Sequence, residues 1–285
     1  MPLFNNRPRW HKVPKDERQA AETFLRNREK FCVTASARFL GIRESRGHVW
    51  CLTGAGGEIT ALLLHSRRSL FPIFDKNPGV PGPRFLNRFL VKVPVHALQG
   101  TREDTEILER LMRDQGYNAA ERIDYDLMSL DSASGAEAFR AGPPGLILRP
   151  PLAADTEALF ALQSAYEQEE VVPGNAEYNP AVSRLNIEHI LKKEQMYVAE
   201  LGGKIVGKIN TSARSFGRYQ IGGVYVRPEY RGLGIGVKMT AVFAESLLAR
   251  GMGVTLFVKK QNAAARAVYR KAGFRVLGDY RITYY

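Results

Sequence analysis

The chain has 285 residues, which is enough for two domains of ordinary size. Its 45% hydrophobic and 25% charged residues are typical of a globular protein, and its longest apolar runs, such as residues 59–64, are too short to span a membrane. The formal net charge of +12 does not favour nucleic acid as a partner, because the basic residues are spread along the chain without a lysine-rich tract.

The N-terminal residues and the cysteines indicate the cellular compartment. Residues 1–7 lack the apolar segment of a secretory signal, and the chain has only two cysteines, Cys32 and Cys51. We therefore expect a reduced, cytoplasmic protein in which both cysteines are small core residues. No metal site is expected, because the five histidines are scattered without metal-ligand spacing: His11, His48, His65, His96 and His189.

The first half opens with a predicted hairpin over residues 49–61, whose strands flank a glycine-rich turn. Later in this half, residues 95–100 are typical of a strand, 105–115 of a helix and 123–130 of another strand. Small and turn-forming residues then fill 132–145, which predicts a linker.

The second half repeats this order. Residues 196–207 predict another hairpin around Gly202 and Gly203, and the half closes with a helix, the pair Gly273-Phe274 and a strand over 280–285. An internal duplication explains both halves most simply, with domains at 1–131 and 146–285.

A glycine-rich loop is the strongest local signal in the second half. A strand-like run, 221–226, leads into Arg231-Gly232-Leu233-Gly234-Ile235-Gly236, and an apolar helical run, 237–248, follows. Glycines allow the backbone to turn sharply with N–H groups pointing inward, and the first turn of the helix adds its unpaired amides. A pyrophosphate group suits such a loop, with Arg231 as a nearby cation.

Two common phosphate loops do not match. A P-loop would end in Gly-Lys-Ser/Thr, which is missing here, and a dinucleotide fingerprint would be spaced Gly-x-Gly-x-x-Gly rather than Gly-x-Gly-x-Gly.

A second block follows. Residues 254–258 are typical of a buried strand, and Asn262 is a good N-cap for the alanine-rich helix after it. That helix carries Tyr269 and ends at Gly273.

Together these blocks resemble the GNAT superfamily of N-acetyltransferases, over roughly residues 145–285. Residues 231–236 fit its loop pattern Arg/Gln-x-x-Gly-x-Gly/Ala, and Asn262, Tyr269, Gly273 and Phe274 fall on its second coenzyme wall. The resemblance implies an α/β (α+β) chain of two tandem GNAT-like domains, each a mixed, mostly antiparallel sheet flanked by helices. It implies acetyl-CoA as co-substrate, bound by Val224, Tyr225, Val226, Arg231, Gly232, Leu233, Gly234, Ile235, Gly236, Val237, Asn262 and Tyr269.

The first half lacks these features. Prolines separate its glycines between Phe74 and Val95, no Arg-x-x-Gly-x-Gly occurs, and Met112 stands at the position that matches Tyr269. We expect a degenerate GNAT-like domain without a coenzyme site.

Acetyl transfer from a thioester to an amine needs a neutral amine, a polarised carbonyl and an acid for the leaving thiolate. The resemblance implies Tyr269 as the acid, and a backbone N–H at or beside Val226 for the carbonyl. The clustered carboxylates Glu169 and Glu170 are candidate bases, because mutual repulsion raises pKa values. The resemblance also suggests acceptor contacts at Asn210, Ser212 and Tyr225.

The sequence thus predicts an N-acetyltransferase that moves acetyl from acetyl-CoA to a primary amine directly, within a ternary complex. The alternative is a non-catalytic acyl-CoA-binding regulatory or scaffold protein. The identity of the amine and the formation of a homodimer are left open.

Overall fold

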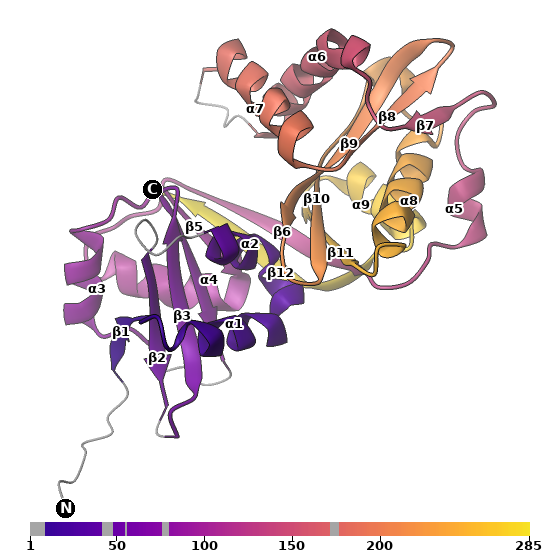
Figure 1. Cartoon of the computed structure of the whole chain (residues 1–285). Coiled ribbons are helices and arrows are strands. Elements are labelled where there is room, and N and C mark those ends of the chain that lie inside the picture. The colour runs from indigo at the N-terminus through magenta and orange to yellow at the C-terminus, as the bar shows by residue number, and fades with distance from the viewer. Residues whose placement is uncertain (1–8, 42–47, 55, 76–79, 172–176) are drawn as a thin grey trace, which may run out of the picture. The chain divides into compact units, whose positions relative to one another are not determined.

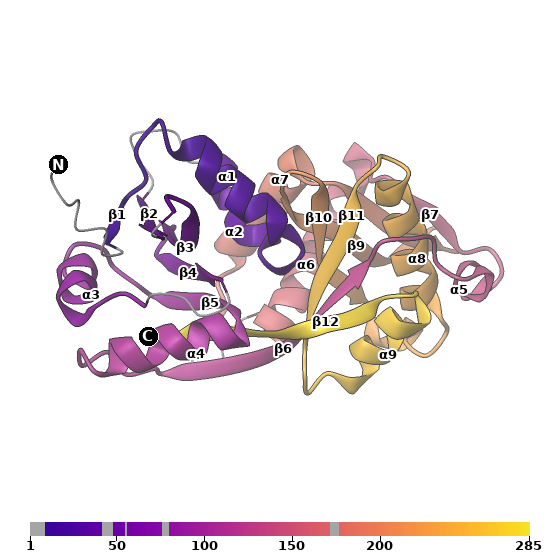
Figure 2. The ribbon, with the colours of Figure 1, turned by 90° about the horizontal axis from the view of Figure 1, so that it is seen from below.

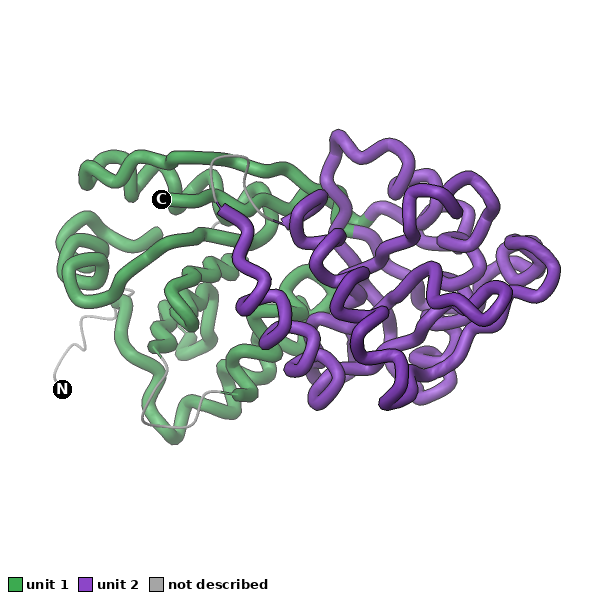
Figure 3. Tube along the Cα trace, turned by 90° about the horizontal axis from the view of Figure 1, so that it is seen from above, with its two compact units in different colours: residues 1–127, 277–285 green, residues 128–276 purple. Residues whose placement is uncertain are grey.

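The computed structural model describes residues 9–41, 48–54, 56–75, 80–171 and 177–285. The chain forms two compact units (Figure 3). Unit 1 comprises residues 1–127 and 277–285, and unit 2 comprises residues 128–276. No helix in the described ranges is long and apolar enough to cross a membrane.

Unit 1 contains seven strands and four α-helices among its described residues (Figure 1), two of the strands continuing into unit 2. They are β1 (Trp10–Lys12), α1 (Arg18–Asn27), α2 (Val33–Gly41), β2 (His48–Thr53), β3 (Ile59–Ser66), β4 (Ser69–Phe74), α3 (Pro83–Leu90), β5 (Ala97–Thr101), α4 (Arg102–Arg113), β6 (Glu121–Leu130) and β12 (Arg275–Tyr284).

Unit 2 contains the remaining elements. They are α5 (Ala136–Arg140), β7 (Ile147–Arg149), α6 (Thr156–Tyr166), a π-helical turn (Glu167–Val171), α7 (Pro180–Lys193), β8 (Met196–Leu201), β9 (Lys204–Arg214), β10 (Arg218–Val226), α8 (Ile235–Leu248), β11 (Gly253–Lys259) and α9 (Ala263–Lys271).

The predicted duplication is visible in the strand order. In unit 1, β1 to β4 pair antiparallel in succession and β4 then pairs parallel with β5. In unit 2, β7 to β10 pair antiparallel in succession and β10 pairs parallel with β11. The α/β class with mixed, mostly antiparallel sheets is therefore confirmed.

The last strand of the chain does not stay with the half that precedes it. Residues 277–285 belong to unit 1, where β12 pairs antiparallel with β5, from Tyr280 opposite Thr101 to Tyr284 opposite Ala97 (Figure 2). The end of β6, residues 128–130, belongs to unit 2. Each unit thus contains strand residues from the other half of the sequence. A single division of the chain at 132–145, as predicted, does not account for this exchange.

The stretch predicted as a linker packs on unit 2 instead. It contains α5, whose Ala138 is buried in the unit 2 core, and the Ser134 hydroxyl donates to the Ala272 carbonyl at 2.7 Å. Small residues suit a linker and a close contact equally well, so composition alone could not separate these outcomes.

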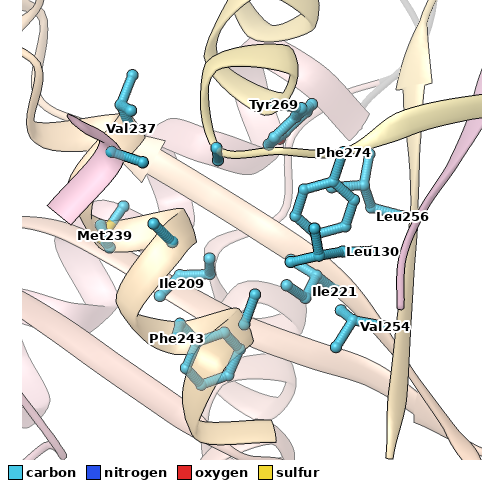
Figure 4. Close-up of a cluster of buried hydrophobic side chains, with 14 of the residues drawn as sticks. Leu130, Ile209, Ile221, Val237, Met239, Phe243, Val254, Leu256, Tyr269 and Phe274 are labelled. Atoms are coloured by element: carbon cyan, nitrogen blue, oxygen red, sulfur yellow. The ribbon is translucent and has the colours of Figure 1, made fainter. Parts of the chain in front are cut away.

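Helices cover both faces of the unit 2 sheet. Val198 packs with Leu159 of α6 and Ile187 of α7, whereas its neighbour Ala199 belongs to the cluster under α8, because side chains alternate along a strand. That second cluster is shown in Figure 4 and includes Ile209, Ile221, Met239, Phe243, Leu256, Tyr269 and Phe274.

The two cysteines are both free and buried, as expected.

Candidate functional site

The parallel strands β10 and β11 separate partway along their length. They pair from Arg218 opposite Gly253 to Ile221 opposite Leu256, and their pairing ends there although β10 continues to Val226 and β11 to Lys259. The opening leaves the backbone of residues 222–226 without a partner strand on this side. A polar ligand can therefore pair with it as an added strand would.

The register of β10 with β9 also shifts in this opening, between Gly222 and Tyr225. Gly223 has a φ of +57°, and a Cβ atom added to it would lie 2.3 Å from Asn210 Oδ1 and 2.8 Å from Lys208 Nζ. Only glycine fits, because any side chain would collide with these buried groups.

The glycine-rich loop follows β10 and forms the predicted amide cradle. Gly232 and Gly234 have φ of +81° and +80°, and Gly234 is the N-cap of α8. In the part of the chain that the structure describes, the N–H groups of residues 232–237 have no hydrogen-bond partner, and the first amide to find one is Lys238 N, which donates to Gly234 O at 3.2 Å. Unpaired amides and the positive end of the helix dipole both favour an anion here.

The glycines have different steric surroundings. A Cβ at Gly232 would meet nothing within 4 Å, whereas one at Gly234 would lie 2.8 Å from the backbone N of Gly142. A Cβ at Gly236 would make an ordinary contact of 3.5 Å with Val268, which places α9 against the first turn of α8. Of the three, Gly232 is the one whose side-chain position is open.

Arg231 does not point freely toward the loop. Its guanidinium donates to Glu169 Oε2 at 2.7 Å and to Val226 O at 3.0 Å, and lies 5.3 Å from the centroid of the Tyr225 ring. The hydrogen bond from Arg231 lowers the pKa of Glu169. The expectation that carboxylate repulsion would raise this pKa is therefore wrong for Glu169.

Glu170 is also paired with a cation. Lys259 Nζ lies 3.3 Å from Glu170 Oε2 and donates to its backbone oxygen at 2.6 Å. The Asn262 amide donates to Glu170 Oε1 at 2.9 Å, while its own Oδ1 caps α9 by accepting from Ala265 N at 2.9 Å. These contacts attach the π-helical turn to the start of α9.

Tyr269 is buried on α9, with its ring edge-on to Phe274 at a centroid distance of 6.3 Å. Burial raises its pKa, and nearby Tyr166 and Glu170 raise it further. The hydroxyl is therefore protonated at neutral pH, as an acid must be before it reacts.

Lys208 is a site residue that the sequence analysis did not single out. It is fully buried on β9, donates to Gly223 O at 2.8 Å and to Asn210 Oδ1 at 3.1 Å, and lies 4.8 Å from the centroid of the Tyr166 ring. A lone lysine inside the apolar run 205–209 was the available signal. Its contacts connect β9, the shifted segment of β10 and the end of α6.

A buried carboxylate lies next to this cluster. Glu167 accepts hydrogen bonds from Gln163 at 2.7 Å, from Asn186 at 2.9 Å and from the Ser183 hydroxyl. Three donors satisfy it, as a buried charge requires.

The remaining predicted residues lie along the same elements. Val224 and Val226 are half-buried and Tyr225 is buried on β10, Leu233 is exposed in the loop, and Ile235 and Val237 are buried in α8. Of the acceptor contacts, Asn210 is buried against Lys208, and Ser212 is hydrogen-bonded to Gln220.

One group of three described residues could hold a metal ion, and it lies in unit 1. His11 Nε2 is 2.9 Å from Glu17 Oε2 and 3.3 Å from Cys51 Sγ. His11 and Cys51 face each other across β1 and β2, a pairing that spacing in the sequence does not reveal. As they stand, the three groups satisfy one another by hydrogen bonding.

Comparison with known proteins agrees with this geometry. Residues 157–274 match the sequence model of the acetyltransferase (GNAT) family. The chain is similar to mycothiol acetyltransferases: 38% identical over 86 residues to that of Streptomyces bingchenggensis, covering 28% of this chain and 27% of the relative, and 29% identical over 144 residues to that of Amycolatopsis mediterranei, covering 44% and 48%. The chain thus spans about a quarter to a half of these relatives.

Solved structures match the fold over nearly the whole chain. A GCN5-related N-acetyltransferase from Sphaerobacter thermophilus has a TM-score of 0.58 at 20% identity, covering 99% of this chain and 96% of that one. A tandem GNAT protein from the clavulanic acid biosynthesis pathway has a TM-score of 0.57 at 13% identity, covering 97% and 98%.

Proposed function

We propose that unit 2, whose residues 157–274 match the acetyltransferase (GNAT) family model, binds acetyl-CoA and transfers its acetyl group to a primary amine. The observation that carries this proposal is the row of unpartnered N–H groups at 232–237, at the positive end of α8 and after the strand that parts from β11. Coenzyme A supplies the pyrophosphate for such a cradle.

The reaction balances with groups of this unit. The amine nitrogen forms a bond to the acetyl carbon and releases a proton to water, the carbon–sulfur bond breaks, and the thiolate takes up a proton from an acid that water then reprotonates. Tyr269 donates that proton, and a free N–H of β10 in the opening, at or beside Val226, polarises the carbonyl oxygen.

The absence of cysteine from unit 2 supports direct transfer in a ternary complex. Both cysteines of the chain, Cys32 and Cys51, precede residue 128, and both are buried. An acyl-cysteine intermediate therefore has no residue to form on within unit 2.

The acidic turn after α6 fits the acceptor side. Glu169 pairs with Arg231, which lowers the pKa of Glu169, and Glu170 pairs with Lys259. Both carboxylates therefore suit a cationic amine as electrostatic partners. An incoming ammonium group would exchange with these cations.

Unit 1 has no counterpart of the cradle among its described residues. Its helix α3 follows β4 as α8 follows β10, but α3 begins with Pro83, which has no N–H to offer. Residues 76–79 of the proline-rich stretch lie outside the described part of the chain. We therefore assign coenzyme binding to unit 2 alone.

The test is thiol release from acetyl-CoA with a panel of primary amines, compared between wild type and Tyr269→Phe. Loss of the acid should lower kcat by roughly 10²–10⁴-fold with little change in coenzyme affinity. Tyr197→Phe, a half-buried tyrosine packed on Phe243, is the matched control and should retain full turnover.

Two results would count against the proposal. Coenzyme binding without amine-dependent thiol release would favour the non-catalytic alternative, an acyl-CoA-binding regulatory or scaffold protein. Full turnover by Tyr269→Phe would return this tyrosine to a packing role.

A further inference from the structure

Unit 1 has a cavity of about 750 Å³ between the strands β1 and β2 and the helix α3. It lies apart from the gap between β4 and β5, the counterpart of the coenzyme opening in unit 2: none of its lining residues comes from either strand. The volume is within the range of sites that hold a small molecule.

Aromatic rings form the apolar walls of this cavity. Trp10 of β1 stacks on Phe85 of α3 at a centroid distance of 5.6 Å and an interplanar angle of 24°, and Trp50 of β2 meets Phe89 edge-on at 4.7 Å. The indole N–H of Trp10 has no hydrogen-bond acceptor among the described residues, so packing against Phe85 and Phe74 orients this ring. Such walls favour a flat ring as the guest.

Four cations also line the cavity. Arg84, Arg88 and Lys92 recur every four residues and so lie on one side of α3 and its C-terminal turn, and Arg9 adds a fourth cation from the residue before β1. None of the four makes an ion pair within the described residues, and no aspartate or glutamate lines the cavity. Burial and the neighbours His65 and Lys12 lower the pKa of His48, which keeps this fifth basic group neutral at physiological pH.

From this combination we propose that unit 1 binds a small planar aromatic anion, a ring bearing a phosphate group, between α3 and the β1–β2 edge of its sheet. The ring enters among Trp10, Trp50 and Phe85, and the phosphate is held by Arg84 and Arg88, whose guanidinium groups match its oxygens. The site is independent of the acetyltransferase proposal, because none of its residues belongs to unit 2.

A mononucleotide and an aryl phosphate share this chemistry, whereas a nucleic acid strand requires a different kind of site. A strand needs a groove that continues beyond one residue and many phosphate contacts. The cavity instead collects its cations around one set of rings, which favours a single small ligand.

The chain allows a direct measurement. Its only two tryptophans, Trp10 and Trp50, both line the cavity, so intrinsic tryptophan fluorescence reports on this site and not on unit 2. Full-length protein is titrated with adenosine 5′-monophosphate and with phenyl phosphate, with adenosine and inorganic phosphate as the separated parts, and free tryptophan corrects for absorbance.

We expect saturable quenching by at least one of the two combined ligands, and binding at least 10-fold weaker for both separated parts. The stronger of the two combined ligands distinguishes a nucleotide from an aryl phosphate. The double variant Arg84→Gln, Arg88→Gln should weaken binding at least 10-fold, and Phe85→Leu should weaken it while keeping the wall filled. Arg113→Gln, an exposed arginine on α4 away from the cavity, is the control and should bind as wild type.

Three outcomes would overturn the proposal: no saturable quenching by either combined ligand, equal binding of adenosine and its monophosphate, or unchanged binding in the double arginine variant. If a short single-stranded oligonucleotide bound more tightly than both combined ligands, with a steep salt dependence, the site would be assigned to nucleic acid instead. Far-ultraviolet circular dichroism of each variant separates lost binding from lost folding.

Discussion

A lysine inside a protein core costs free energy unless other groups replace its hydration shell. Lys208 has the Gly223 carbonyl, the Asn210 side chain and the face of Tyr166 in that role. Burial nevertheless lowers its pKa from 10.5 to about 7, and the charge of Glu167 only partly offsets this. Lys208 is therefore able to change its charge near neutral pH, next to the shifted segment of β10.

This gives a pH prediction for stability. Between pH 7 and 10.5 the unfolded chain keeps the Lys208 proton that the folded chain has released, so stability rises with pH across this window and is lost as pH falls through about 7. The wild type should gain on the order of a few kcal/mol across the window relative to Lys208→Met. Urea unfolding at a series of pH values measures this difference, with the exposed Lys204→Met as the control. Parallel profiles for wild type and Lys208→Met would contradict it.

The open position at Gly232 allows a test of the anion cradle. Asn and Asp tolerate a positive φ better than most residues, so Gly232→Asn and Gly232→Asp carry the same backbone cost and nearly the same shape. They differ by one negative charge at the place proposed for the pyrophosphate. Calorimetric titration with coenzyme A should show binding at least 10-fold weaker for the Asp variant than for the Asn variant, at equal thermal stability. Equal affinities would place the phosphates elsewhere.

Residue partners were the least predictable part of the site. The loop glycines, Asn262 and Tyr269 could be assigned because each belongs to a local pattern. The pairing of Arg231 with Glu169 joins residues 62 positions apart, and that of Asn262 with Glu170 joins residues 92 apart. Such contacts depend on how helices and strands pack, and a single sequence carries no local signal for that.

At the scale of elements, α9 is held at its start by one side chain with two tasks. Asn262 accepts from Ala265 N and donates to Glu170, so it caps the helix and attaches the π-helical turn to it. Removal of the cap exposes an unsatisfied amide at the helix start.

Asn262→Ala should lower the free energy of unfolding by about 1–2 kcal/mol, measured by urea denaturation. Asn262→Ser keeps a cap but is too short to reach Glu170. It should therefore recover most of the stability, whereas any change in amine KM caused by loss of the Glu170 contact should persist. Equal losses for both variants would mean that the Glu170 contact, and not the cap, carries the stability.

The elements themselves were largely predictable, and the exceptions have a physical cause. Strand alternation and helix caps gave the hairpins at 49–61 and 196–207, the strands β5, β6, β10 and β11, and the helices α4, α8 and α9, whereas α1, α2, α3 and α7 were not predicted. The stretch 132–145 was predicted as a linker because its residues are small, yet small residues also allow the close approach of Gly142 to Gly234. Low side-chain volume therefore marks both free and tightly packed segments.

For the whole molecule, the strongest dependence is that of unit 1 on residues 277–285. Within this stretch Tyr280 and Thr283 are buried, and the Arg281 guanidinium donates to Asp124 at 2.7 Å and to Glu106 at 3.2 Å. Without it, β5 would be left with an open edge.

Deletion of residues 277–285 should therefore unfold unit 1, whose state the two tryptophans report. Tryptophan emission should shift to that of solvent-exposed rings, and a synthetic peptide of these residues should reverse the shift. Val276→Ser, an exposed site just before the deleted stretch, should behave as wild type. Native emission from the truncated chain would show that β12 is dispensable for unit 1.

The placement of β12 also sets the order in which the protein can be completed during synthesis. β5 is made early, yet Tyr280, which lies opposite Thr101, follows about 180 residues later, a delay on the order of ten to forty seconds at ribosomal speed. All residues of unit 2 leave the ribosome within that interval. Unit 1 thus gains its last strand only after every residue of unit 2 has been made, and until then β5 presents an open strand edge that other chains could pair with.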